Sequence, residues 1–397
     1  MVGDDGWRYP LWNVRSVEPE SSGSPGDRNS VMSSPNARVQ SVLESLVHDS
    51  GESGLQVAAY LDGQLAIDAR AGMADDIARR PVDGDTLFTA FSISKGITAT
   101  CVHILADRGL IDYDAPIAFY WPEFGAKGKD RATVRHALTH RVGIPQDPPD
   151  FDISMAGDWD AVCRTVAQME PLWEPGSRTG YHPLTYGWML GEVVRRVDGR
   201  PIARFLQEEV CRPLGITDMY FGVPPEAEQR VATLRNAPVI EDSDMISLTP
   251  SLVDTAGAFN RSEVRRASIP GAGAIVNARS VARHYAMLAD GGTLDGARVL
   301  SRERIAAATT LQPEDADSAG IRWWTGHGLG YTLGGGTGPM AGRPHAFGYE
   351  GVGTVGFADP ARRFAFAFLK NLLDLSAHEM DSATLVVRAV EESLGIG

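Results

Sequence analysis

The chain has few cysteines and no long apolar run. Only three of its 397 residues are cysteine, an odd number without any CxxC spacing, which excludes a disulfide framework and a zinc knuckle. We therefore expect Cys101, Cys163 and Cys211 to be small buried side chains. No stretch of about 18 consecutive apolar residues occurs, so the sequence predicts no membrane-spanning helix.

Positive charge is also scarce. The chain has 37 Lys and Arg against 51 Asp and Glu, which is a formal net charge of −14, and its isoelectric point is near 5.1. This balance disfavours nucleic acid and anionic membranes as partners. The hydrophobic fraction of 43% and the charged fraction of 22% are typical of a soluble globular protein.

The N-terminal segment lacks the positively charged start and the apolar core of a secretory signal. Residues from Glu18 to about Pro35 are rich in Ser, Gly and Pro, a composition that favours disorder. We therefore expect residues 1–38 to form a disordered leader on a cytoplasmic protein.

Two hairpins are predicted near opposite ends of the remaining chain. The stretch "LQVAAYLDGQLAIDARAG" (55–72) has two apolar runs joined at Asp62-Gly63, a strong signal for a two-residue turn. The alternating "FAFAFL" (364–369) follows "TVGFADPARR", in which Asp359-Pro360 supplies a turn. We expect these strands to share one antiparallel sheet.

Helices are predicted between and after the hairpins. The stretch "TYGWMLGEVVRRVDG" (185–199) has an apolar stripe and stops at Gly199. The stretch "SATLVVRAVEESLG" (382–395) is typical of a closing helix.

The predicted fold class is therefore α/β, of the α+β type. An antiparallel sheet built from both chain ends is flanked by helices, and an all-helical domain is inserted between its parts. We assign residues 39–115 and 265–397 to the mixed α/β domain, and residues 116–264 to the mainly helical domain.

Ser92 and Lys95 lie in "FTAFSISKGITAT" (88–100), directly before an apolar repeat typical of a helix. Gly109 suits the end of this helix. Residues three apart on a helix are neighbours, so the Lys95 amine can reach the Ser92 hydroxyl. The apolar positions behind this pair are Ile97, Cys101, Ile104 and Leu105.

A serine hydroxyl is a poor nucleophile at neutral pH and needs an adjacent base. Lysine can be that base only if burial and positive potential lower its pKa. A helix N-terminus contributes positive potential, and its backbone N–H groups can hold an oxyanion. An isolated SxxK tetrad is common, however, so by itself it leaves open both an ordinary helix start and a catalytic pair.

The surrounding sequence resembles serine β-lactamase-like enzymes, whose first motif is SxxK. The match is to the branch of class C β-lactamases and family VIII carboxylesterases, and it covers nearly everything from about Val39 onward. Besides the SxxK stretch, the segments that carry the resemblance are "LIDYDAPIAFYWPEF" (110–124), "ATVRHALTHRVGIP" (132–145), "WEPGSRTGYHPLTYGWMLGEVVRR" (173–196), "RPLGITDMYFGVP" (212–224), "PGAGAIVNARSVARHYAMLADGG" (270–292) and "FGYEGVGTVGFADP" (347–360).

The resemblance implies the fold described above and acyl transfer in two steps through a serine ester. Ser92 matches the nucleophile and Lys95 its base partner. Tyr181 of "GYHP" matches the tyrosine of the family's YxN motif and would pass protons, with Lys95 nearby as the required cation. The implied oxyanion hole consists of the backbone N–H groups of Ser92 and Val352.

The chain departs from β-lactamases at two motifs. Pro183 stands where YxN has an asparagine that holds the substrate's acylamino group, and proline has no donor to offer. Tyr349-Glu350-Gly351 stands where the family has Lys-Thr-Gly or His-x-Gly, so the usual cation is missing. Both changes argue against penicillins and cephalosporins as the main substrate. We expect these residues, together with His182, to line the substrate site, although Tyr349 is equally compatible with a plain wall position.

Other patterns in the sequence give weaker evidence about function. Residues 351–356 satisfy GxGxxG, but strand and turn residues follow where a dinucleotide site needs a helix. His136 and His140 have metal-ligand spacing without a third ligand, and we interpret them as structural. No GxSxG elbow occurs, which excludes an α/β-hydrolase site. We predict neither a metal nor a cofactor.

The sequence therefore predicts a serine-dependent hydrolase of small-molecule carboxylic esters. The alternative is a transacylase that moves the acyl group to an amine or alcohol in a biosynthetic pathway. β-Lactamase or D-peptidase activity ranks third, and a non-catalytic binding protein on the same scaffold is the alternative of a different class. The expected partner is a small ester or acyl donor, and the oligomeric state stays open.

Overall fold

The computed structural model describes residues 34–237, 248–313, 326–336, 338–374 and 381–397. Most of the leader predicted at residues 1–38 therefore lies outside the described residues. Its last residues do not: helix α1 (Pro35–Asp49) already begins at Pro35, and the Ser34 hydroxyl caps it by accepting a hydrogen bond from the Ala37 amide at 3.2 Å.

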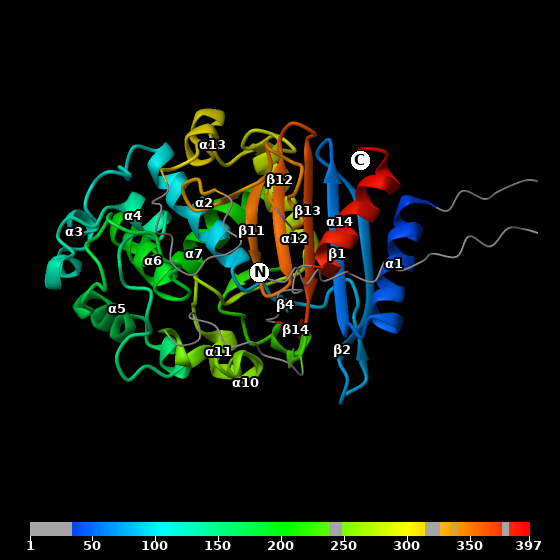
Figure 1. The fold of residues 1–397 in the computed structure, drawn as a ribbon, viewed down its shortest axis with the longest axis horizontal. Helices are drawn as coiled ribbons and strands as arrows, with labels where there is room; N and C mark the ends of the chain where they lie inside the picture. Colours follow the sequence, from blue (N-terminus) through cyan, green and yellow to red (C-terminus); the bar gives the residue numbers. More distant parts are fainter. Residues whose placement is uncertain (1–33, 238–247, 314–325, 337, 375–380) are drawn as a thin grey trace, which may run out of the picture. The chain divides into compact units, whose positions relative to one another are not determined.

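A seven-stranded antiparallel sheet is the largest element of the fold (Figure 1). A strand from the N-terminal part, β1 (Gly54–Leu61), pairs with one from the C-terminal part, β13 (Phe364–Lys370), which confirms that both chain ends build one sheet. In spatial order the strands are β10 (Thr332–Leu333), β11 (Phe347–Gly351), β12 (Thr354–Asp359), β13 (Phe364–Lys370), β1 (Gly54–Leu61), β2 (Gln64–Asp75) and β3 (Arg80–Pro81).

Both predicted hairpins are confirmed. Asp62 and Gly63 join β1 to β2 with φ of 50° and 76°, as a two-residue turn between twisted strands requires. In the second hairpin the Asp359 carboxylate accepts a hydrogen bond from the Ala361 amide at 3.2 Å, which supports the turn from β12 to β13.

The alternation in "FAFAFL" (364–369) separates two hydrophobic clusters. Side chains of a strand point alternately to its two faces. The phenylalanines of β13 pack in a cluster with helices α1 and α14 (Asp381–Leu394), and its alanines face helix α12 (Ala278–Ala289) on the other side. The small side chains leave room for α12 to approach the sheet.

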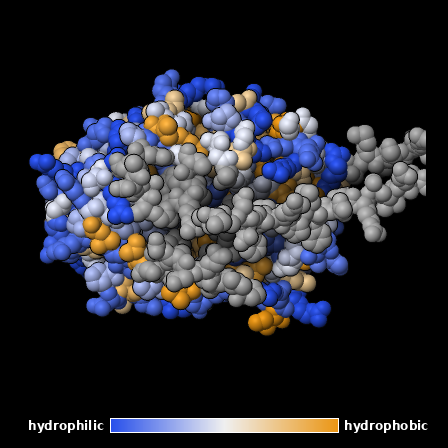
Figure 2. Space-filling view, in the orientation of Figure 1, coloured by the Kyte–Doolittle hydropathy of each residue, from blue (hydrophilic) through white to orange (hydrophobic). Residues whose placement is uncertain are grey.

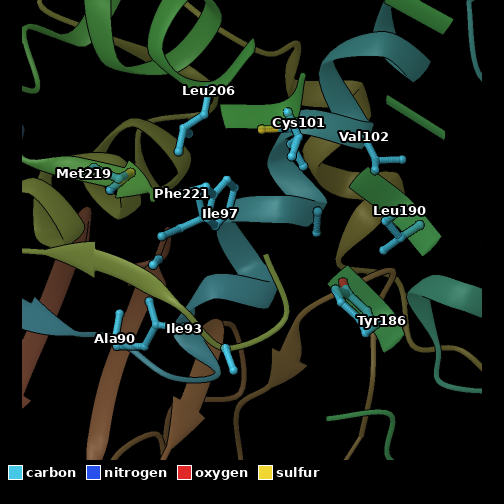
Figure 3. Packing of buried hydrophobic residues seen from close by; sticks show 14 of the residues in the cluster. Ala90, Ile93, Ile97, Cys101, Val102, Tyr186, Leu190, Leu206, Met219 and Phe221 are labelled. Carbon is cyan, nitrogen blue, oxygen red and sulfur yellow. The ribbon is translucent and has the colours of Figure 1, made fainter. Parts of the chain in front are cut away.

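Helix α2 (Ile93–Asp107) lies in the interior, and its surroundings differ from the single apolar stripe that its sequence predicts. Every residue from Ile93 to Ala106 is buried, because the sheet, helix α6 (Thr185–Asp198), helix α13 (Arg302–Ala308) and α12 pack around it. Figure 3 shows this packing, with Ile93, Ile97 and Cys101 of α2 among residues from several other elements. The buried polar side chains of α2 form hydrogen bonds, for example Thr100 with His284 at 2.9 Å.

The remaining elements are short. A small three-stranded sheet, β4-β7-β5, lies beside the start of α2, and β6 pairs with β14 in parallel. Their bounds are β4 (Phe88–Thr89), β5 (Met219–Phe221), β6 (Arg235–Asn236), β7 (Ala274–Val276), β8 (Thr293–Leu294), β9 (Ala297–Arg298), β14 (Leu372–Leu373), α3 (Ile117–Tyr120), α4 (Val134–Leu138), α5 (Trp159–Gln168), α7 (Ile202–Leu206), α8 (Arg212–Leu214), α10 (Thr255–Asn260), α11 (Ser262–Arg266) and α13 (Arg302–Ala308).

Helices dominate between α3 and α11, as the helical insert requires, while the exact domain boundaries stay a prediction. All three cysteines are buried and free, as expected. On the face shown in Figure 2, hydrophilic residues predominate and hydrophobic ones are scattered. No helix within the described ranges combines the length and apolarity needed to cross a membrane.

Candidate active site

Ser92 lies at the N-terminal end of α2, where the chain turns sharply out of β4. The preceding residue, Phe91, has a φ of 45°, in the left-handed region that side chains rarely adopt. The Thr354 hydroxyl lies 2.6 Å from the Gly351 carbonyl oxygen and 3.2 Å from the Ala90 carbonyl oxygen, and it shares its hydrogen between them, which ties this turn to β12. Ser92 itself is only half-buried, so its hydroxyl stands at the surface of an otherwise buried helix.

Lys95 is fully buried one helical turn beyond Ser92. Its Nζ lies 3.1 Å from Ser92 Oγ, 2.9 Å from the Pro183 carbonyl oxygen and 2.6 Å from the Gly271 carbonyl oxygen. Burial holds the pKa of Lys95 well below its usual value, because a charged amine loses its hydration there. The predicted meeting of Ser92 and Lys95 is therefore present in the structure.

Tyr181 approaches Ser92 from the loop that precedes α6. Its hydroxyl forms a very short hydrogen bond with Ser92 Oγ, and Lys95 Nζ lies 4.5 Å from the centre of its ring. The structure thus brings together three side chains that the resemblance to the SxxK enzymes placed in one site.

The turn between β11 and β12 closes the site on the other side of Ser92. A Cβ on Gly351 would lie 2.8 Å from both Cβ and N of Ser92, so only glycine permits this approach. Val352 has a φ of 51°, which is exceptional for a β-branched residue. In the described part of the chain no acceptor is found for the amide of Ser92 or Val352, so both can donate to an oxyanion.

His140 belongs to this site, which our interpretation of the sequence missed. It is fully buried, its ring centre lies 4.9 Å from that of Tyr181 with the two planes tilted by 34°, and its Nε2 lies 2.9 Å from Tyr349 Oη. His136 behaves as expected, since it completes a capping box with Thr133 at the start of α4. The spacing of His140 from His136 suggested a metal pair and gave no sign of this role. The one available signal was that His140 lies in a segment that resembles the family.

The structure disagrees with the prediction that His182 contacts substrate. Its ring is fully buried, its Nδ1 lies 2.6 Å from the Gly180 carbonyl oxygen, and its Nε2 accepts from the amides of Gly143 and Ile144 at 3.2 and 3.0 Å. Burial accordingly lowers the pKa of His182 to about 3. This histidine ties two loops together.

The other predicted substrate-site residues fall into two groups, buried and half-buried. Pro183 is buried and offers its carbonyl to Lys95. Tyr349 is only 3% exposed, so its hydroxyl faces protein groups. Glu350 and Gly351 are half-buried at the end of β11, and of the two Gly351 lies directly against Ser92. Their contact with substrate stays a prediction.

The glycine-rich and histidine patterns, which the sequence did not assign to a cofactor, can now be located in the structure. Residues 351–356 form the turn and start of a hairpin, with no helix behind them. Within the described ranges no group of three or more His, Cys, Asp or Glu could hold a metal ion. A surface cavity of about 620 Å³ exists, but residues of α12, α13 and the β12–β13 turn line it, and none of the Ser92 partners does.

A half-buried serine that meets a buried lysine and a tyrosine at a helix N-terminus, on this sheet, defines a serine hydrolase of the SxxK type. A family model described as Beta-lactamase matches residues 39–390, and the chain therefore belongs to the beta-lactamase family. The fold is the serine β-lactamase-like one.

Individual relatives agree. The chain is 33% identical over 346 residues to Esterase/beta-lactamase LipL of Mycobacterium tuberculosis, a match covering 81% of this chain and 77% of that protein. A penicillin-binding protein homologue from Caulobacter crescentus has a similar structure, with a TM-score of 0.82, 33% identity, and 90% and 97% of the two chains covered. A family VIII carboxylesterase is similar with a TM-score of 0.80, 32% identity and the same coverage.

Proposed function

We propose that this protein hydrolyses carboxylic esters of small molecules through an acyl-enzyme on Ser92. The observation that carries the proposal is the contact of Ser92 Oγ with both Lys95 Nζ, at 3.1 Å, and the Tyr181 hydroxyl. The relatives named above as esterases favour an ester substrate within the family.

The surroundings of Lys95 favour its action as a base. A neutral amine has two hydrogens and one lone pair. The carbonyls of Pro183 and Gly271 can only accept, so they take both hydrogens. The lone pair is then left for the third neighbour, the Ser92 hydroxyl, whose proton it can remove.

Acylation follows from this arrangement. Ser92 Oγ attacks the ester carbonyl carbon while its proton passes to Lys95, and the amides of Ser92 and Val352 stabilise the resulting oxyanion. The carbon–oxygen bond to the alcohol then breaks, and Tyr181 gives its proton to the departing oxygen. The products of this half-reaction are the acyl-Ser92 ester, the free alcohol, a protonated Lys95 and a Tyr181 phenolate.

Water completes the cycle. The Tyr181 phenolate takes a proton from water as the water oxygen attacks the acyl carbon. When the bond to Ser92 breaks, protonated Lys95 returns its proton to Ser92 Oγ. The carboxylic acid leaves, and all three side chains regain their starting protonation.

Two features count against β-lactams as the main substrate. Pro183 has no side-chain donor for an acylamino group. At position 349 a buried phenol, already hydrogen-bonded to His140, stands where a cation would meet a substrate carboxylate.

The test uses the full chain and a fluorophosphonate probe, followed by peptide mass spectrometry. We expect one adduct, on Ser92, and hydrolysis of p-nitrophenyl esters that Ser92→Ala abolishes. Product analysis with and without added amines and alcohols then separates water from other acceptors: a dominant transfer product would establish the transacylase instead. Absence of both the adduct and turnover would support a non-catalytic binding protein.

A further inference from the structure

A row of hydrogen bonds begins at the backbone amide of His182 and leads through His140 to Tyr349. That amide donates to Nδ1 of His140 at 3.0 Å. A backbone N–H can only donate, so Nδ1 carries no proton and the neutral ring has its proton on Nε2. Burial, with His182, His327 and Lys95 nearby, holds the pKa of His140 well below its usual value, so the ring is neutral at physiological pH.

Tyr349 is the next member of the row. Nε2–H of His140 donates to Tyr349 Oη at 2.9 Å, so the hydrogen of Tyr349 is available to another acceptor. Lys95 Nζ lies 4.5 Å from the ring centre of Tyr181 and 5.9 Å from that of Tyr349, so the two phenols flank the same amine. Burial, and next to it the nearby Tyr181, hold the pKa of Tyr349 well above its usual value. Because His140 already donates to Tyr349, the Tyr349 hydroxyl can direct its own hydrogen at the Tyr181 oxygen.

The same direction continues to the amine. A neutral Lys95 gives its two hydrogens to carbonyls. Ser92 then donates to the remaining lone pair of Lys95, and the Ser92 oxygen accepts from Tyr181. With the Tyr349 hydroxyl directed at Tyr181, every hydroxyl in this row accepts one hydrogen bond and donates one.

His140 also forms hydrogen bonds with the backbone amides on both sides of Tyr181. Its carbonyl accepts from the Gly180 amide at 3.0 Å, and its Nδ1 accepts from the His182 amide. It does so with a φ of 58°, a conformation that costs energy and persists only where surrounding contacts enforce it.

We propose that Tyr349 and His140 are positioning residues, which aim the Tyr181 hydroxyl at Ser92 and stabilise the Tyr181 oxygen after its proton has left. They keep their own protons throughout. In this protein the neutral donors Tyr349 and His140 therefore take the place that the lysine cation has in enzymes with a Lys-Thr-Gly motif. The inference rests on the proposed function, since it concerns the proton that Tyr181 gives to the departing alcohol.

Tyr349→Phe removes the donor to Tyr181 and keeps the ring. We expect kcat to fall about tenfold or more with KM nearly unchanged. The missing donor matters most once Tyr181 has become a phenolate, and this happens during the reaction and not during substrate binding. Losing the donor raises the pKa of the Tyr181–Lys95 pair, so the pair stays protonated to higher pH. The acid limb of the pH–kcat profile should then move upward by about half to one pH unit.

Two substitutions of His140 separate its contacts. His140→Asn keeps an acceptor for the His182 amide and tolerates positive φ, but it is too short to donate to Tyr349. His140→Gln can reach Tyr349 with an N–H donor. We expect the asparagine variant to reproduce the loss of kcat and the shifted acid limb, and the glutamine variant to recover most of both.

A second buried His–Tyr pair supplies the control. His103 Nδ1 lies 2.7 Å from Tyr113 Oη, on the far part of α2. Tyr113→Phe should lower thermal stability and leave kcat and its pH profile unchanged. Thermal unfolding of every variant shows whether it is folded.

Two outcomes would overturn the inference: an unchanged kcat and pH profile in folded Tyr349→Phe, or equal profiles for the His140 variants. In either case a Ser92 adduct and esterase activity in the wild type would leave the proposed function standing. Loss of the adduct in the wild type would instead remove the proposed function itself.

Discussion

Two buried lysines of this protein, Lys95 and Lys129, have nearly the same surroundings and different chemistry. Both are fully buried. Lys129 Nζ donates to three carbonyls, those of Ala126, Ala167 and Met169, at 2.9, 3.1 and 2.5 Å. Lys95 has two carbonyls and the Ser92 hydroxyl.

The third partner makes the difference. Three carbonyls can only accept, so they are all satisfied only by a protonated amine with three hydrogens. A hydroxyl can also donate, so an amine beside it can be neutral and act as a base. One lysine therefore joins loops, and the other can take a proton.

The largest effect is expected for Lys95→Met. Removing the base should lower kcat by about 10²- to 10⁴-fold. It also leaves the carbonyls of Pro183 and Gly271 without a donor, so we expect the free energy of unfolding to drop by about 2 kcal/mol. Steady-state kinetics with p-nitrophenyl esters and urea unfolding measure the two quantities. A folded Lys95→Met with wild-type kcat would contradict the assignment of the base.

Lys129→Met should lower stability at least as much and leave kcat unchanged. It leaves three buried carbonyls without a donor, and we expect the free energy of unfolding to drop by about 3 kcal/mol. The kcat of the folded fraction should stay at the wild-type value, since Lys129 does not contact Ser92. A stable but inactive variant would break the comparison.

The titration of Lys129 sharpens the comparison further. Burial lowers its pKa to about 8, whereas the unfolded chain has an ordinary lysine near about 10.4. Between these pH values the unfolded state binds more protons, so stability rises with pH there. The unfolding free energy of the wild type minus that of Lys129→Met should thus rise by about 2 kcal/mol across this window. A flat difference in urea titrations would show that the three carbonyls keep the amine's pKa ordinary.

The smallest effect is expected for Pro183→Ala. Lys95 contacts the backbone carbonyl of Pro183, and alanine retains that carbonyl. We expect kcat to stay within about threefold of the wild type, which is less than the loss of one good hydrogen bond. A large loss, measured with the same esters, would mean that the proline ring itself positions Lys95.

Local patterns made much of the fold and site predictable. Asp62-Gly63 and the alternating "FAFAFL" determine hairpins within a few residues, and Ser92 with Lys95 form one turn of helix. Tyr181 and Gly351 came from the resemblance, and the structure places both beside Ser92.

Contacts between distant segments were harder to predict. His140 and Tyr349 are 209 positions apart, and no spacing in the sequence links them. His182 looked like a pocket residue because it follows Tyr181, yet its ring points into the protein and binds two loop amides. Helix α2 showed one apolar stripe, but neighbouring elements bury it all around.

The sequence by itself determined which local elements form and which side chains carry the chemistry, because turn residues, strand alternation and one helical turn act over short distances. The tertiary structure alone decided which buried lysine can be neutral at physiological pH. That choice depends on whether the third atom near each amine belongs to a carbonyl or to a hydroxyl, and only the folding together of distant segments sets it.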